Sequence, residues 1–147
     1  MTYLQGIHKS LLSICFITSI FALSSPAFAK DPESFRDLMK YMGEEYTKVA
    51  EGILKQDYKQ LSEAANNIAF HPEPPLTQRM KIIAKLGTNF MDFKSWDDEV
   101  HLSAVALTKA AKDKNNAEIL KHNAMMLKKC TSCHDKYRDL VKTLRIK

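Results

Sequence analysis

The chain has 147 residues, with 22 basic and 17 acidic side chains and a formal net charge of +5 at pH 7. This length suits one domain with a single hydrophobic core. The charge is mild and both signs are mixed along the chain, which excludes a nucleic-acid-binding protein with a strongly basic face.

Residues 1–29 have the composition of a secretory signal peptide. They contain one lysine, Lys9, and no acidic residue, then an apolar stretch over 11–23, and they end in Ala-Phe-Ala at Ala29. A basic start, a short apolar middle and small residues at the end are the three parts of a cleavable signal. The apolar stretch is short and interrupted by serine, which argues against a membrane anchor. We therefore expect export to the periplasm and a mature chain, 30–147, that is not embedded in the membrane.

The mature chain begins with two predicted helices. Apolar residues recur over 33–55 at the spacing of one buried helix face, and Asp31 or Ser34 can cap the start. A second, shorter helix is predicted over 57–69, with its small and apolar residues facing inward.

The second half of the chain follows a proline-rich break at 71–75. A weak apolar pattern over 80–86 suggests a short helix or turn, and we expect 90–93 to be a loop packed under the bundle. A third long helix is predicted over 95–112, and a fourth opens at 115 or 116 and continues towards Leu144. Four long helices with short connections predict an all-α, antiparallel up-down-up-down four-helix bundle. Such bundles build cofactor sites between facing helices.

The last predicted helix carries the most informative motif, Cys130-Thr131-Ser132-Cys133-His134. Cys-X-X-Cys-His is the attachment sequence of a c-type haem. Two thiols three residues apart lie on one face of a helix, so both can reach the two vinyl groups on one edge of the porphyrin. His134 follows directly, and its imidazole can bind the iron. We therefore expect one covalently bound haem c, with His134 as an axial ligand.

Other roles for this cysteine pair fit the sequence less well. Cys15 is lost with the signal, which leaves Cys130 and Cys133 in the mature chain. A disulfide between them would close a very small loop and stabilise little. A thioredoxin-like pair would need strands around it, and a zinc site would need further ligands at the right spacing. We expect the remaining histidines of the mature chain to lie at the surface without a partner at ligand spacing: His71, His101 and His122.

The bundle topology predicts where a second iron ligand would come from. The first and fourth helices run antiparallel, so the start of the first lies at the same end as the C-terminal half of the fourth. His134 is in that half, and the candidates at the same end are Met39 and Met42. A methionine at helical spacing is ordinarily a core residue, but beside a haem motif we expect one of them to bind the iron.

These motifs resemble those of the cytochrome c′ family, the class II c-type cytochromes. The run from Cys130 to Arg138 matches the family's closing sequence, Cys-X-X-Cys-His-X-X-Tyr-Arg. The run Met39-Lys40-Tyr41-Met42-Gly43 is similar to the Met-Lys-X-X-Gly segment of the low-spin branch, whose methionine is the sixth iron ligand. The resemblance covers 30–147 in helix order. It implies a single-electron carrier with Met39 as the sixth ligand.

The resemblance leaves two points open. The family usually carries an arginine four residues before the distal residue, whereas Arg36 is three residues before Met39, so Met42 stays an alternative ligand. Family members are often dimers through their first two helices, which makes a homodimer an open expectation here.

The residues after the haem motif have weaker interpretations. We expect Tyr137 to pack beside the porphyrin. Arg138 either lies against the haem and offsets its propionates or is a solvated arginine near a helix end. Basic residues gather in this region: Lys128, Lys129, Lys136, Arg138, Lys142, Arg145 and Lys147. They are either a solvated helix face or a docking rim for an acidic redox partner, whose attraction would speed encounter.

The sequence as a whole predicts an exported monohaem cytochrome that transfers single electrons to other redox proteins and is not an enzyme. Methionine opposite histidine favours ferrous iron and raises the reduction potential. The alternative is a five-coordinate protein that binds nitric oxide or carbon monoxide at an open distal position. The two functions differ in whether Met39 binds the iron.

Overall fold

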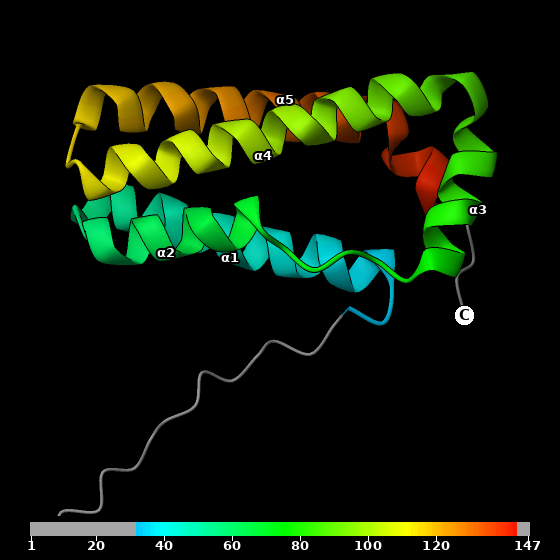
Figure 1. Ribbon diagram of the computed structural model, residues 1–147, viewed down its shortest axis with the longest axis horizontal. Coiled ribbons are helices and arrows are strands. Elements are labelled where there is room, and N and C mark those ends of the chain that lie inside the picture. Colours follow the sequence, from blue (N-terminus) through cyan, green and yellow to red (C-terminus); the bar gives the residue numbers. More distant parts are fainter. Residues whose placement is uncertain (1–31, 144–147) are drawn as a thin grey trace, which may run out of the picture.

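The computed structural model describes residues 32–143, and this part of the chain is all helical, with no strand (Figure 1). Four long helices pack along one another, and two shorter ones connect the second long helix to the third. In chain order they are α1 (Phe35–Lys55), α2 (Tyr58–Ala69), α3 (Leu76–Leu86), the 3₁₀ turn η1 (Gly87–Asn89), α4 (Phe90–Lys112) and α5 (Asn116–Lys142). The predicted four-helix, all-α fold is confirmed. The predicted signal peptide, 1–29, lies outside the described residues.

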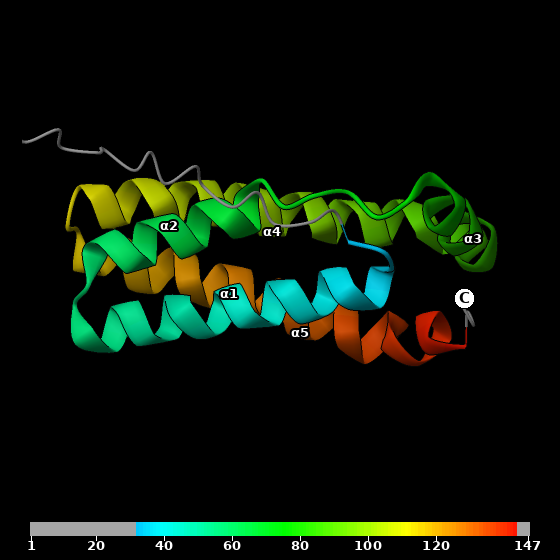
Figure 2. The ribbon, with the colours of Figure 1, turned by 90° about the horizontal axis from the view of Figure 1, so that it is seen from below.

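Successive long helices run in opposite directions, as Figures 1 and 2 show. Helix α2 packs against α1 and α4, and α4 packs against α5. Helix α3 lies across one end of the bundle. The start of α1 and the C-terminal half of α5 lie at this same end, as the predicted topology requires. None of the described helices is both long and apolar enough to cross a membrane.

Side-chain caps mark the starts of α1, α2 and α5. The Ser34 hydroxyl accepts a hydrogen bond from the N–H of Asp37 at 3.1 Å and so satisfies a free donor at the start of α1. Gln56 adopts a left-handed conformation, φ 55°, which ends α1. Asp57 and Asn115 cap α2 and α5 in the same way as Ser34 caps α1. Short polar residues therefore set where these three helices begin.

Helix α4 begins at Phe90, so the prediction of a loop over 90–93 is wrong. The turn η1 leads directly into α4, and Phe90, Phe93 and Trp96 then recur at helical spacing. All three pack in one cluster with Tyr137 of α5, which explains why the segment is helical. Helix α4 thus begins five residues before the predicted start at 95.

The hydrophobic core is divided into two clusters. The larger one fills the middle of the bundle and includes Val49, Leu61, Leu107 and Met126, all fully buried. The smaller one lies at the α3 end, and its buried members are Ile82, Leu86 and Tyr137. A smaller cluster beside the main core is common in domains of this size. The place where the two clusters meet matters here because of the residues that lie there.

Candidate functional site

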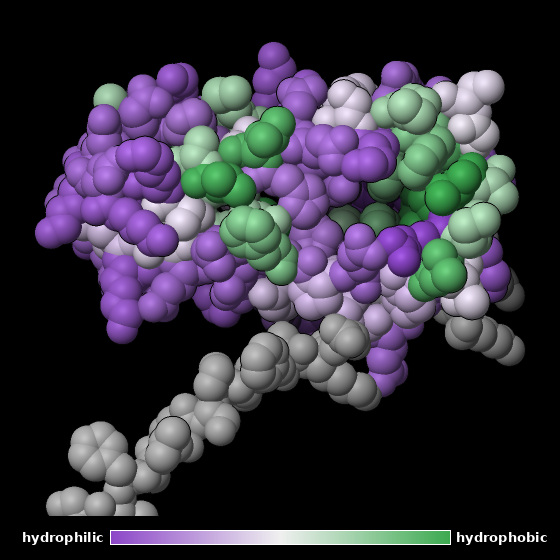
Figure 3. All heavy atoms as spheres, in the orientation of Figure 1, coloured by the Kyte–Doolittle hydropathy of each residue, from purple (hydrophilic) through white to green (hydrophobic). Residues whose placement is uncertain are grey.

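The two cysteines of the motif lie where the core divides. Cys130 and Cys133 are both half-buried on α5, and neither is in a disulfide. Cys130 packs against the larger cluster, whereas Cys133 packs against the smaller one. Figure 3 shows a hollow in the surface between the α4–α5 and α1–α2 layers, towards the α3 end, bordered by apolar side chains.

The surroundings of the thiols keep them protonated. Burial raises the pKa of both thiols, that of Cys133 to about 11, and the negative charge of Asp97 on α4 acts in the same direction. A dithiol redox pair works through a thiolate with a lowered pKa. The environment of these two cysteines is the opposite of that, which agrees with the sequence argument against a thioredoxin-like site.

His134 lies next to the thiol pair with its side chain exposed. Among the described residues its imidazole has no hydrogen bond or ion pair, so both ring nitrogens are available. A core histidine would be buried and bonded. The imidazole of His134 is therefore not held by core packing or by a hydrogen bond to another described residue.

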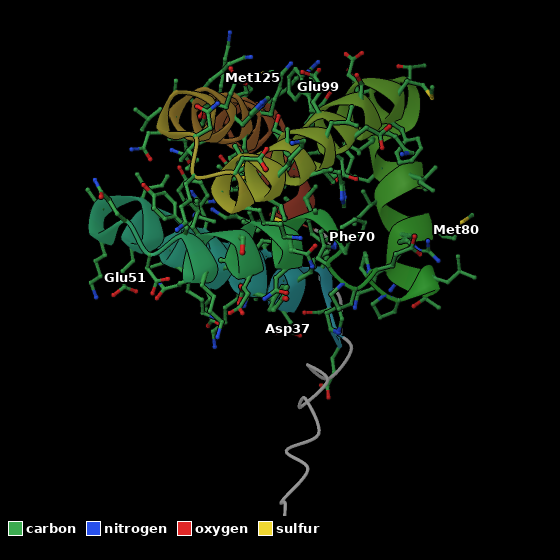
Figure 4. The ribbon with its side chains drawn as sticks, turned by 60° about the vertical axis from the view of Figure 1, so that its left-hand side comes forward. Asp37, Glu51, Phe70, Met80, Glu99 and Met125 are labelled. Carbon is green, nitrogen blue, oxygen red and sulfur yellow. The ribbon has the colours of Figure 1, made fainter. Side chains whose placement is uncertain are left out.

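The two methionines on α1 differ in what they contact. Met39 and Met42 are both half-buried. Met42 packs against the larger cluster, but Met39 belongs to neither cluster. Figure 4 shows the start of α1, marked by Asp37, and its opposite end, marked by Glu51. Met39 is thus the methionine nearer the start of α1, and its thioether is not committed to core packing.

Tyr137 occupies the smaller cluster beside Cys133. Its side chain is 3% exposed, its hydroxyl donates a hydrogen bond to the Asn89 carbonyl at 3.3 Å, and its ring centroid is 5.6 Å from those of Phe93 and Trp96. This tyrosine anchors α5 to α4 and η1. Arg138 is exposed on α5, and among the described residues it has no hydrogen bond or ion pair.

Several basic residues near the motif are paired with carboxylates. The ion pairs are Lys129 with Glu99 at 2.7 Å, Lys136 with Asp92 at 3.2 Å and Lys142 with Asp139 at 3.3 Å. Lys128 and Arg138 are exposed, and Arg145 and Lys147 lie outside the described residues. The positive field expected around this end of α5 is therefore partly neutralised by acidic neighbours.

The expectation that three histidines are unpartnered at the surface is wrong. His71 and His101 lie with their ring centroids 4.7 Å apart, and Asp97 lies beside them. His122 is largely buried, and its Nε2 is 3.1 Å from a Glu118 carboxylate oxygen. The packing of α2 against α4 brings His71 and His101 together from positions 30 residues apart. The four-residue spacing of Asp97 and His101 on a predicted helix was the sequence signal that could have indicated part of this cluster.

A shallow hollow of about 320 Å³ lies between α2 and α4, lined in part by Phe70, Val105 and Lys109. Phe70 projects at its rim (Figure 4). Its lining includes no cysteine, histidine or methionine, so it takes no part in the site around the thiols.

No protein-family model, curated protein or solved structure matches this chain. The residues themselves therefore provide the test of whether a c-type haem fits. They offer two protonated thiols on the inner side of one helix and an uncommitted imidazole next to them. They also offer an uncommitted thioether on α1 at the same end of the bundle. This donor set fits the group that the sequence motif predicts.

Proposed function

We propose that the protein is a periplasmic monohaem c-type cytochrome that carries single electrons. Cys130 and Cys133 would hold haem c through thioether bonds. The observation that carries this proposal is the position of the two thiols at the division of the hydrophobic core. An apolar group bound to both sulfurs would contact both clusters, because each sulfur already packs against one of them.

The chain's own residues would bind the iron and exclude water. His134 is the proposed proximal ligand and Met39 the proposed distal one, because Met42 already packs in the core. The haem supplies a one-electron couple, and a histidine–methionine ligand pair favours its reduced form. The smaller cluster around Tyr137 covers the α3 end of the site and would keep solvent away from it.

A second candidate function is binding of nitric oxide or carbon monoxide by five-coordinate iron. It depends on the same residue, Met39, which is half-buried and belongs to neither cluster. If Met39 does not bind the iron, the distal position is open to a small ligand. The spin state of the wild-type protein and of a Met39→Ala variant separates the two functions.

The experiment that tests the proposal is an intact-mass measurement. The full chain is expressed with its own signal in a bacterium that attaches haem in the periplasm, and non-covalent haem is removed by acid–acetone extraction. We expect a mass equal to the chain from Lys30 plus one haem. The double variant Cys130→Ala, Cys133→Ala, which has neither thiol, should lose the attachment, and Ser132→Ala, a change inside the same motif, should keep it. A wild-type mass equal to the bare chain would contradict the proposal.

A further inference from the structure

We propose that His71, Asp97 and His101 form a binding site for a divalent transition-metal ion such as Zn²⁺, with ligands other than the two cysteines. One ligand atom from each residue lies within 4.8 Å of the ligand atoms of the other two. Nε2 of His101 is 3.7 Å from Oδ2 of Asp97. Two imidazoles and one carboxylate are a donor set that zinc takes in proteins. This inference does not depend on the proposed function.

The hydrogen bonds of the two rings leave a nitrogen of each free for a metal. Nδ1 of His101 is 2.7 Å from the Ala69 carbonyl oxygen, and Nδ1 of His71 is 2.9 Å from the Pro72 carbonyl oxygen. A carbonyl oxygen can only accept, so each Nδ1 carries the hydrogen and each neutral ring keeps a lone pair on Nε2. Metal-binding histidines show this same arrangement, in which the second nitrogen donates to a carbonyl and orients the ring.

The distances are close to those that a shared ion requires. With bonds of about 2.1 Å, tetrahedral coordination places two ligand atoms about 3.4 Å apart. The His101 and Asp97 atoms, at 3.7 Å, are already near this separation. The Asp97 side chain is 48% exposed, so it can rotate to bring its oxygen into place without disturbing the core.

The ligands are held on elements that pack against each other. Asp97 and His101 lie one turn apart on α4, and His71 follows α2, whose last residue accepts the hydrogen bond from His101. Prolines at 72, 74 and 75 limit the freedom of the segment that carries His71. The neighbouring carboxylate, Asp98, is bound to Lys94 at 2.6 Å. That lysine therefore pairs with Asp98, and Asp97 keeps its contact with His101.

The site has three protein ligands and is partly open to solvent. An ion bound there would keep at least one position for water or another small ligand. Nitrogen-rich donor sets bind late first-row ions most tightly, with affinity rising towards Cu²⁺ and remaining high for Zn²⁺. Magnesium and calcium prefer oxygen ligands and should not compete.

The test is a Zn²⁺ titration of the purified mature protein, without a polyhistidine tag, against a chromophoric chelator at pH 7.5. We expect one ion per chain and a higher unfolding temperature in the presence of zinc. His71→Gln, His101→Gln and Asp97→Asn should each weaken binding at least tenfold. Asp97→Asn alters an exposed residue, so it reports on binding even if a histidine variant folds poorly.

His122→Gln is the matched control. His122 and Glu118 are also a histidine and a carboxylate four residues apart on one helix, at 3.1 Å, but they belong to no three-residue cluster in the described part of the chain. We expect this variant to bind zinc as the wild type does. An equal loss in the control would mean that any such pair binds zinc weakly, and would overturn the proposal.

A second background separates this site from the cysteines. If haem is not attached, Cys130 and Cys133 could themselves bind zinc, so the titration is repeated in a Cys130→Ala, Cys133→Ala double variant. Retention of one zinc ion per chain supports the proposal whatever the fate of the haem. Loss of all zinc binding in the double variant, or no binding in the wild type, overturns it.

Discussion

Replacing Met39 and Met42 one at a time separates iron ligation from core packing. The two residues are the same type, lie one helical turn apart on α1 and are both half-buried. Met42 packs against the larger cluster, whereas Met39 packs against neither. Each is therefore the control for the other. With haem attached, we expect the wild type to be low-spin and six-coordinate in both oxidation states, with carbon monoxide binding slowly or not at all.

The structure gives the size of the packing effect. Truncating a fully buried methionine to alanine costs about 2–5 kcal/mol. Met42 is half-buried, so Met42→Ala should cost about 1–2 kcal/mol and lower the unfolding temperature by roughly 5–10 °C. Met39 packs against neither cluster, so Met39→Ala should cost less than about 1 kcal/mol in the haem-free chain. In the haem-bound protein it should open the iron, turn the spectrum high-spin and admit carbon monoxide.

Absorption spectra of the oxidised, reduced and carbon-monoxide-treated proteins check the ligand, and thermal unfolding checks the packing. A high-spin wild type that binds carbon monoxide readily would refute Met39 ligation and favour the gas-binding function. A high-spin Met42→Ala variant would keep the electron-transfer function but show that Met42 is the ligand.

In haem-free protein, iodoacetamide should alkylate Cys133 at pH 8 about 100-fold more slowly in the folded than in the unfolded chain, because a thiol pKa of about 11 instead of 9.0 leaves about 100-fold less thiolate. The alkylation rate of the folded protein should rise about tenfold per pH unit up to that pKa. Equal rates in the two states would contradict the burial of this thiol. Gly52→Ala should destabilise the bundle by about 1–2 kcal/mol in a denaturant titration, because the new Cβ would lie 2.9 Å from Cβ and 3.0 Å from Cα of Leu61. The control Gly43→Ala, whose Cβ would have nothing within 4 Å, should be neutral or stabilising by up to about 1 kcal/mol. A larger loss of stability in Gly43→Ala than in Gly52→Ala would refute the close approach of α1 and α2. If the basic residues after the haem motif dock an acidic redox protein, the rate of electron transfer in stopped-flow measurements should fall as added salt reduces the Debye length below about 10 Å. The fall should be modest, because three of these lysines are paired with carboxylates. A rate that does not change with salt would exclude these residues as a docking surface.

The sequence alone determined the helical fold and the motif. Apolar residues at helical spacing predict the four long helices. The caps Ser34 and Asn115 are each one of the two candidates that the sequence offered. These are local properties, because a helix's hydrogen bonds and its capping side chains connect residues at most four positions apart. The spacing of Cys130 and Cys133 on one helix face is local in the same sense.

The tertiary structure decided the features that depend on residues far apart in the chain. Phe90 and Phe93 belong to the cluster around Tyr137 of α5, and this contact between residues far apart in the chain cannot be read from the sequence. Met39 and Met42 look alike in the sequence, and only the packing of the bundle shows that Met42 belongs to the core. His71 reaches His101 because α2 packs against α4, and a backbone carbonyl lies beside each ring. Two histidines that have no partner in the sequence pattern therefore belong to a cluster of possible metal ligands in the folded protein.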